Sequence, residues 1–289
     1  MTAVFRKEFK SSLLGMTGPI FIFAVLVILG FFTMTYQFRY ASSHFEYAIV
    51  DGAFWSLLLT PILTMRSFSE ERRTKTDQLL YSLPITTTEI VLGKYLAMVA
   101  VFAIPCAVTC LYPLIASLYS AGDMNFGVCY GAIGAYFLLG CAVIAIGMLF
   151  SSLFESQVIC AIINLAALLL LYFIKTGISM VPDESWLTLI LFIMIALGIA
   201  VILYFATKNY IVSGVAGVLL IGAAVTVYII EPSLYVGLDK DIISALYIFQ
   251  PITAFATGVI DLTCYVYYLS ICAIFAFITV QSFESRRWN

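Results

Sequence analysis

The chain has 289 residues, of which 63% are hydrophobic and 10% charged, and its formal net charge at pH 7 is −2. Soluble domains carry about 25% charged residues, so this composition cannot cover a water-facing surface and disfavours a soluble fold. Its long continuous apolar runs indicate membrane-spanning α-helices rather than strands, which would alternate apolar and polar residues. No basic cluster is large enough to predict nucleic acid as a partner.

Residues 1–17 form the first predicted element, a short amphipathic helix. Phe5, Phe9 and Leu13 recur every four residues, and the basic residues of the segment fall on other faces. Such a helix lies in the membrane interface, in contact with membrane lipids. The apolar run that follows has no A-x-A cleavage site, so it is interpreted as a retained first span rather than a signal peptide.

About eight spans follow by the criterion of roughly 20 mostly apolar residues. They are Pro19–Gln37, Ala48–Met65, Ile90–Tyr119, Phe126–Phe154, Gln157–Lys175, Trp186–Ala206, Tyr210–Ile230 and Leu262–Phe283. Pro105 and Pro113 predict a kink in the third span, because proline has no backbone N–H. The sequence therefore predicts an all-α polytopic membrane protein with one transmembrane domain over residues 1–289.

The basic residues predict the orientation. With the N-terminus in the cytoplasm, only Arg39, Lys175 and Lys240 of the 14 lysines and arginines fall outside, as the positive-inside rule requires. Both termini are then cytoplasmic, in a multi-pass protein of the cell membrane. The largest extracytoplasmic loop is residues 231–261, where "DIISALYIF" is expected to form a short interfacial helix that ends in a break at Pro251.

No catalytic, metal or cofactor site is predicted. The chain has a single histidine, His44, which is interpreted as an ordinary loop residue, and it lacks H-E-x-x-H, G-x-S-x-G and the phosphate-binding loop. Its seven cysteines lie in or beside apolar runs without a C-x-x-C pair, so they are interpreted as packing residues. No residue is assigned to substrate binding.

The segment 66–89, "RSFSEERRTKTDQLLYSLPITTTE", is the most polar part of the chain. Its interleaved acids and bases favour a short helix. Pro84 then breaks the chain, and Thr87 or Thr88 is expected to cap the next span ahead of Glu89. A charged loop obeying the positive-inside rule would explain the arginines but not this ordered turn. The pattern predicts a rigid elbow to which a second protein docks.

Two motifs in this chain resemble those of type-2 ABC exporter permeases, most nearly the gliding-motility and nitrous-oxide-reductase-maturation branch. One is the C-terminal segment from Phe249 to Trp288, which ends in "ESRRW". The other consists of Pro61, Leu63, Thr64, Met65, Arg66, Glu70, Glu71, Arg72, Arg73, Leu79, Leu80, Pro84, Glu89, Ile90, Gly93 and Lys94. The family core has six spans, so the sixth and seventh predicted spans form an extra pair.

The resemblance implies a permease that docks a separate cytoplasmic ABC ATPase, which binds the ATP, and pairs with a second permease chain, identical or homologous. It implies export by alternating access, with residues 1–17 as an elbow helix and residues 66–89 as the coupling-helix segment. The implied ATPase-coupling residues are Arg66, Glu70, Glu71, Arg72, Arg73, Leu79, Leu80 and Pro84. Reversing the four charges from Glu70 to Arg73 is expected to leave the fold intact.

Two alternatives remain at this stage. One is a non-transporting component, signalling or structural, of an ABC-type complex. The other is an ion-coupled secondary carrier, which the absence of acids at the predicted span centres disfavours, because such carriers place carboxylates or broken helices at mid-membrane.

Overall fold

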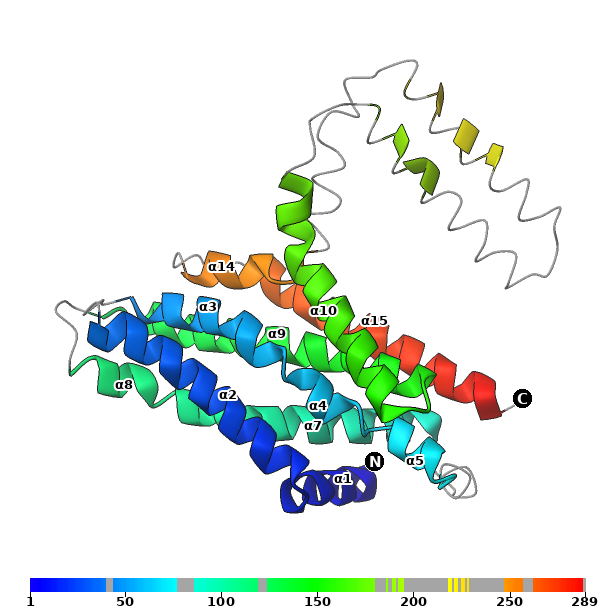
Figure 1. Ribbon diagram of the computed structural model, residues 1–289, viewed down its shortest axis with the longest axis horizontal. Helices are drawn as coiled ribbons and strands as arrows, with labels where there is room; N and C mark the ends of the chain where they lie inside the picture. The colour runs from blue at the N-terminus through cyan, green and yellow to red at the C-terminus, as the bar shows by residue number, and fades with distance from the viewer. Residues whose placement is uncertain are drawn as a thin grey trace. The chain divides into compact units, whose positions relative to one another are not determined.

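The computed structural model of the chain describes residues 1–39, 44–76, 86–118, 124–179, 247–256 and 262–287, together with isolated helical residues between 186 and 228. Every regular element in these residues is a helix (Figure 1). The helices are α1 (Thr2–Leu14), α2 (Thr17–Thr33), η1 (Met34–Arg39), α3 (Phe45–Leu57), α4 (Thr60–Thr64), α5 (Ser69–Arg73), α7 (Thr87–Thr109), α8 (Tyr112–Ala116), α9 (Phe126–Leu153), α10 (Gln157–Ser179), α14 (Gln250–Ala256) and α15 (Leu262–Arg287).

The described residues include five helices long and apolar enough to cross a membrane. These are Thr17–Gln37, Thr87–Ala116, Phe126–Leu153, Gln157–Gly177 and Thr263–Ser285. They correspond to the first, third, fourth, fifth and eighth predicted spans, and they confirm an all-α polytopic membrane protein. The sixth and seventh predicted spans lie largely outside the described residues, so the count of eight stays a prediction.

Two compact units make up the chain. Residues 1–170 and 249–289 form the first unit, and residues 171–248 form the second. The first unit contains the helices discussed below, from α1 to most of α10 and then α14 and α15. The single transmembrane domain over residues 1–289 stays a prediction.

The second predicted span, Ala48–Met65, is wrong as one continuous helix: it is divided into α3 and α4 by a turn at Leu58 and Leu59. Pro61 explains the break, because it has no N–H to donate to the carbonyl of Leu57. The hydroxyl of Thr60 donates to that carbonyl instead, at 2.7 Å. A hydroxyl placed here keeps the interrupted helix free of an unsatisfied backbone acceptor, which would be costly in a bilayer.

The third predicted span has its kink at Cys110 and Leu111, between α7 and α8. The helix α7 continues through Pro105. Pro113 occupies the first turn of α8, where no intrahelical N–H donor is needed. The kink was predicted, and the structure assigns it to the second proline rather than the first.

Only part of the predicted loop 231–261 lies within the described residues. There Pro251 is the second residue of α14, so the expected break at this proline is wrong. The first turn of a helix tolerates proline because its N–H groups have no intrahelical acceptor. The remainder of "DIISALYIF" before Tyr247 lies outside the described residues.

Helix α9 is the centre of the first unit and packs against α3, α4, α7, α14 and α15 (Figure 1). The approach of α7 is close because position 140 is glycine: a Cβ there would lie 2.1 Å from the ring of Phe102. One turn earlier, the buried hydroxyl of Tyr136 lies 2.8 Å from that of Ser56 on α3. Close packing and one satisfied polar pair therefore fix α9 between α3 and α7.

Helix α1 is confirmed as a helix within the predicted segment 1–17, whereas its place in the membrane interface stays a prediction. It packs against α7 and α2. The corner between α1 and α2 is tight, since a Cβ at Gly18 would lie 2.2 Å from the carbonyl oxygen of Ser12. This glycine lets the chain reverse sharply from α1 into the first span.

We expect Gly140→Ala to lower the free energy of unfolding by about 1–3 kcal/mol, because the added methyl group overpacks the contact with Phe102. Thermal unfolding of the purified protein in detergent measures the effect. Gly134→Ala is the matched control on the same helix, since a Cβ there meets nothing within 4 Å. Equal effects of the two substitutions would contradict the packing described here.

Candidate functional site

The described parts of the predicted coupling segment, residues 66–76 and 86–89, lie at one end of the first unit, here called the α5 end. There α5 meets the start of α7, the last turn of α9 and the last turns of α15 (Figure 1). The hydroxyl of Thr87 donates to the carboxylate of Glu284 at 2.5 Å, and the rings of Phe68 and Phe283 lie 5.4 Å apart. The start of α7 and the end of α15 therefore share this end of the unit.

A serine of α9 holds the start of α5. The backbone N–H groups of Phe68 and Ser69 donate to the hydroxyl oxygen of Ser151, at 3.0 and 3.3 Å. The same hydroxyl lies 3.3 Å from the carbonyl oxygen of Met65, to which it donates. Since the first N–H groups of a helix have no intrahelical acceptor, Ser151 supplies one from the central helix.

A buried lysine of α7 holds α5 in place. The ammonium of Lys94, 2% exposed, lies 2.8 Å from Oε1 of Glu71 and 3.4 Å from Oε1 of Glu8 on α1. It also donates to the carbonyl of Ser67 at 2.5 Å and lies 4.9 Å from the ring centroid of Phe68. A buried ammonium needs such partners, because leaving it unpaired costs several kcal/mol. Lys94 thus connects α1, α5 and α7.

The charges of the segment divide between two faces. Glu71, 13% exposed, and Arg72, 9% exposed, lie on the buried side of α5 with Phe68. Arg66 and Glu70 pair at 2.9 Å on the outer side, and Arg73 is exposed there. The expectation that all four charges from Glu70 to Arg73 can be reversed without disturbing the fold is therefore wrong. Because successive positions of a helix point in different directions, the middle two of these four charges face inward and the outer two face outward.

The helix cap also differs from the prediction. Thr86, rather than Thr87 or Thr88, is the N-cap of α7, and it forms a capping box with Glu89. The pattern Thr-x-x-Glu is a sequence signature of this arrangement, so it was available in the sequence. Leu79, Leu80 and Pro84 lie outside the described residues. Their coupling role, like that of the charged residues, stays a prediction.

Comparison with known protein families gives one match, over part of the chain. Residues 53–184 match the sequence profile described as ABC-2 family transporter protein. The match supports an ABC-2 type permease. No curated protein matches the chain. The matched region contains α4, α5, α7 and α9, and with them Lys94, Glu71 and Ser151. A permease of this type is the membrane component of an ABC transporter and implies an ABC ATPase subunit as partner.

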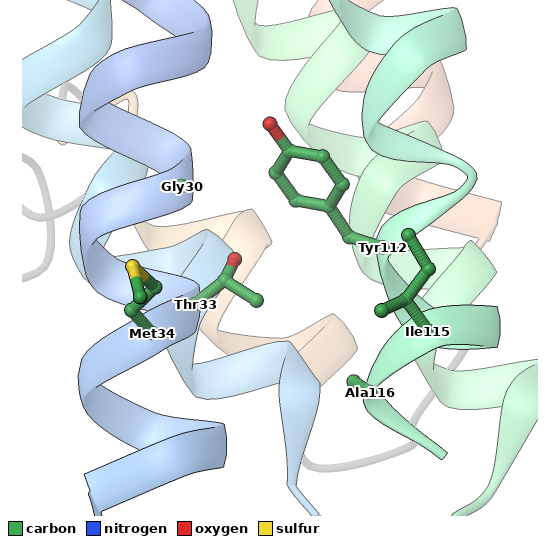
Figure 2. Close-up of a pocket in the computed structure, with 6 residues that line it drawn as sticks. All are labelled: Gly30, Thr33, Met34, Tyr112, Ile115 and Ala116. Atoms are coloured by element: carbon green, nitrogen blue, oxygen red, sulfur yellow. The ribbon is translucent and has the colours of Figure 1, made fainter. Parts of the chain in front are cut away.

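The first unit has a small apolar pocket away from the α5 end. Its volume is about 170 Å³, and Figure 2 shows Thr33 and Met34 on one side facing Tyr112, Ile115 and Ala116 on the other. The side chains come from the last turns of the first span and from α8. The hydroxyl of Thr33 donates to the carbonyl of Leu29 at 2.8 Å. The lining is apolar apart from the hydroxyl groups of Thr33 and Tyr112.

His44 lies directly before α3, where its Nδ1 is 2.7 Å from Oε1 of the buried Glu46. Glu46 also accepts a long contact of 3.9 Å from the thiol of Cys129 on α9. In the described part of the chain, no group of three or more histidine, cysteine, aspartate or glutamate side chains is arranged to hold a metal ion. The contact between His44 and Glu46 joins neighbouring residues at the start of α3.

Sequence reasoning named Lys94 only as a motif residue and did not identify Ser151 or Glu8. One signal was present for Lys94: a lysine four residues into a predicted apolar span requires a partner or access to the interface. Ser151 is one of many hydroxyl residues in the spans, and nothing in its neighbours distinguishes it. The partners of both residues are remote in sequence, so only the packing of α9 and α7 against α5 reveals them.

We expect Lys94→Met to destabilise the protein by about 3–5 kcal/mol, because it leaves a buried carboxylate beside α5 without its closest cation. Arg66→Met is the matched comparison at the exposed pair with Glu70, and we expect a change below about 1 kcal/mol. Thermal unfolding in detergent measures both. If the two substitutions have similar effects, the buried contact between Lys94 and Glu71 does not support the segment.

Proposed function

We propose that this chain is the permease subunit of an ATP-driven exporter, in which a separate cytoplasmic ATPase subunit docks on the segment around α5. The observation that carries the proposal is the division of charge on α5. Its inner face is bound to α1, α7 and α9 through Lys94 and Ser151, whereas Arg66, Glu70 and Arg73 remain on the outer face. A loop that only obeyed the positive-inside rule would not need these internal attachments.

The attachments suggest how movement of the ATPase reaches the membrane. A displacement of α5 acts on α7 through the ion pair of Lys94 and on α9 through the hydrogen bonds of Ser151. Because packed helices transmit strain rather than absorb it, α5, α7 and α9 are expected to move together. Alternating access would follow if ATP binding brings two such segments closer, one in this chain and one in a second permease chain, identical or homologous.

The exporter branch, the remaining docking residues and the orientation of the chain are proposed from the sequence. The motifs from Pro61 to Lys94 and at the C-terminus favour the gliding-motility and nitrous-oxide-reductase-maturation branch of type-2 exporters. In this proposal Leu79, Leu80 and Pro84 continue the docking surface, both termini face the cytoplasm, and ATP is bound by the partner. Export by this chain, rather than a signalling or structural role in the same complex, is favoured by the internal attachment of α5 to membrane-spanning helices.

We expect the double substitution Glu70→Lys with Arg73→Glu to weaken ATPase binding about tenfold. It reverses the pattern of exposed charge without changing the net charge, and charge complementarity governs binding specificity. Co-purification with the ATPase subunit and stimulated ATP turnover in reconstituted membranes measure the effect. The control, Glu70→Asp with Arg73→Lys, keeps both signs and should bind normally. Unchanged binding by the reversed variant, with an unchanged melting temperature, would refute docking at this face.

We expect Thr74→Cys, at the α5 end, to react with a membrane-impermeant thiol reagent only after the cells are permeabilised. Leu118→Cys, just beyond α8, should react in intact cells. The native cysteines are blocked or replaced first, because Cys110 and Cys272 are partly exposed. Labelling of intact cells at position 74 but not at position 118 would reverse the proposed orientation and exclude a cytoplasmic partner at α5.

A further inference from the structure

A polar cavity of about 270 Å³ lies between α1 and the coupling segment. It is distinct from the outer face of α5 proposed above for docking, although Arg66 and Glu70 border both. Its lining comprises Lys7, Glu8, Ser11, Ser12, Gly15, Thr17, Arg66, Ser67, Glu70, Glu71 and Lys94. We propose that this cavity binds the headgroup of a phospholipid that carries both a phosphate and a primary amine.

The charge of the lining favours a zwitterion. Three cations and three carboxylates line the cavity, so the lining is neutral overall. A ligand with a net charge would meet as much repulsion as attraction, whereas a ligand with one charge of each sign can pair both. The two most buried charges of the lining, Lys94 and Glu71, are already paired at 2.8 Å. The charged groups available to a ligand are therefore the more exposed ones.

Lys7 is suited to the phosphate. Its side chain is 65% exposed, and its ammonium lies 3.6 Å from Glu8 and 3.7 Å from Glu71. Both distances exceed the usual hydrogen-bond length for this pair of atoms, so the donors of Lys7 remain available. Oε1 of Glu8 lies near the ammonium groups of Lys7 and Lys94. The second carboxylate oxygen of Glu8 is the one proposed to accept from the ammonium of the ligand.

Three hydroxyl groups add further donors. Many helical hydroxyls in this protein donate to a carbonyl one turn earlier, as those of Thr33, Thr64 and Thr109 do. The hydroxyls of Ser11, Ser12 and Thr17 have no hydrogen-bond partner among the described residues. They line the cavity on the side of α1 and of the first turn of α2. Phosphate oxygens would supply acceptors for them.

The mouth of the cavity favours a lipid over a soluble ligand. Leu14 and Met16, which flank the lining residue Gly15, are 88% and 81% exposed. Ile20 and Phe23 continue the exposed apolar surface along α2. Polar groups in the cavity and apolar side chains directly beside it match an amphiphile, with its headgroup between α1 and α5 and its acyl chains along the first span. Such a lipid would support α1 against the coupling segment.

Binding of matched lipids to the purified full-length chain tests the inference, and ATP coupling is not needed for it. Native mass spectrometry in detergent compares phosphatidylethanolamine, phosphatidylcholine and phosphatidylglycerol with identical acyl chains. We expect the first to bind about tenfold more tightly than the other two, because choline has no N–H to donate and glycerol has no positive charge. Equal binding of the choline lipid would overturn recognition of the amine, and equal binding of the glycerol lipid would overturn the zwitterion.

Two pairs of variants locate the site. Lys7→Gln should weaken binding of phosphatidylethanolamine about tenfold, whereas Lys10→Gln, at an exposed lysine of α1 outside the lining, should not. Ser11→Tyr, which fills the cavity, should have the same effect as Lys7→Gln, and Ser285→Tyr is its control on α15. Unchanged binding in both cavity variants would place the lipid elsewhere. Soluble glycerophosphoethanolamine binding as tightly as the lipid would overturn the assignment to a membrane lipid.

Discussion

The contact between the ammonium of Lys94 and the carboxylate of Glu71 constrains the whole α5 end. Lys94 lies two turns into a long apolar helix and is almost fully buried, so water cannot stabilise its charge. Its partners come from α5, from the turn at Ser67 and from Glu8 on α1. Three separate elements must therefore meet at one atom. The position of the charged segment is fixed by the cost of burying this lysine.

A second constraint acts along the spans, where backbone groups must be satisfied inside the protein because lipid offers no hydrogen bonds. Proline interrupts this pattern at positions 61 and 113. The hydroxyl of Thr60 replaces the missing donor to Leu57, so α3 can end and α4 can begin without a penalty. The charged segment follows α4 directly along the chain.

The short helix α5, together with the residues just before it, has two kinds of surface. Its inner face, with Phe68, Ser69 and Arg72, is buried against other helices, and its outer face carries Arg66, Glu70 and Arg73. This division suits a part that receives force from a soluble partner and passes it to membrane helices. The lipid proposed for the polar cavity beside α1 would add a membrane contact to the same region. Docking, transmission and lipid contact would then meet within a few residues of Lys94.

The sequence alone predicted the all-α membrane class, because a chain with so few charged residues and such long apolar runs has no other stable arrangement. It also predicted the helix in residues 1–17, five of the spans and the polar segment with its motif residues. These properties depend on local composition and periodicity. Pro61, Thr86 and Glu89 carried local signals too, although the break and the capping box were misplaced.

Only the tertiary structure decided which charges of the segment are buried. Glu71 and Arg72 resemble Glu70 and Arg73 in type and spacing, and a helix of one or two turns has no sequence pattern that distinguishes its inner face. That face is set by Ser151, which lies 82 residues from its backbone donor at Ser69, and by Lys94, which lies 27 residues from its backbone acceptor at Ser67. Contacts over such separations depend on how α7 and α9 pack, and packing is a property of the folded chain.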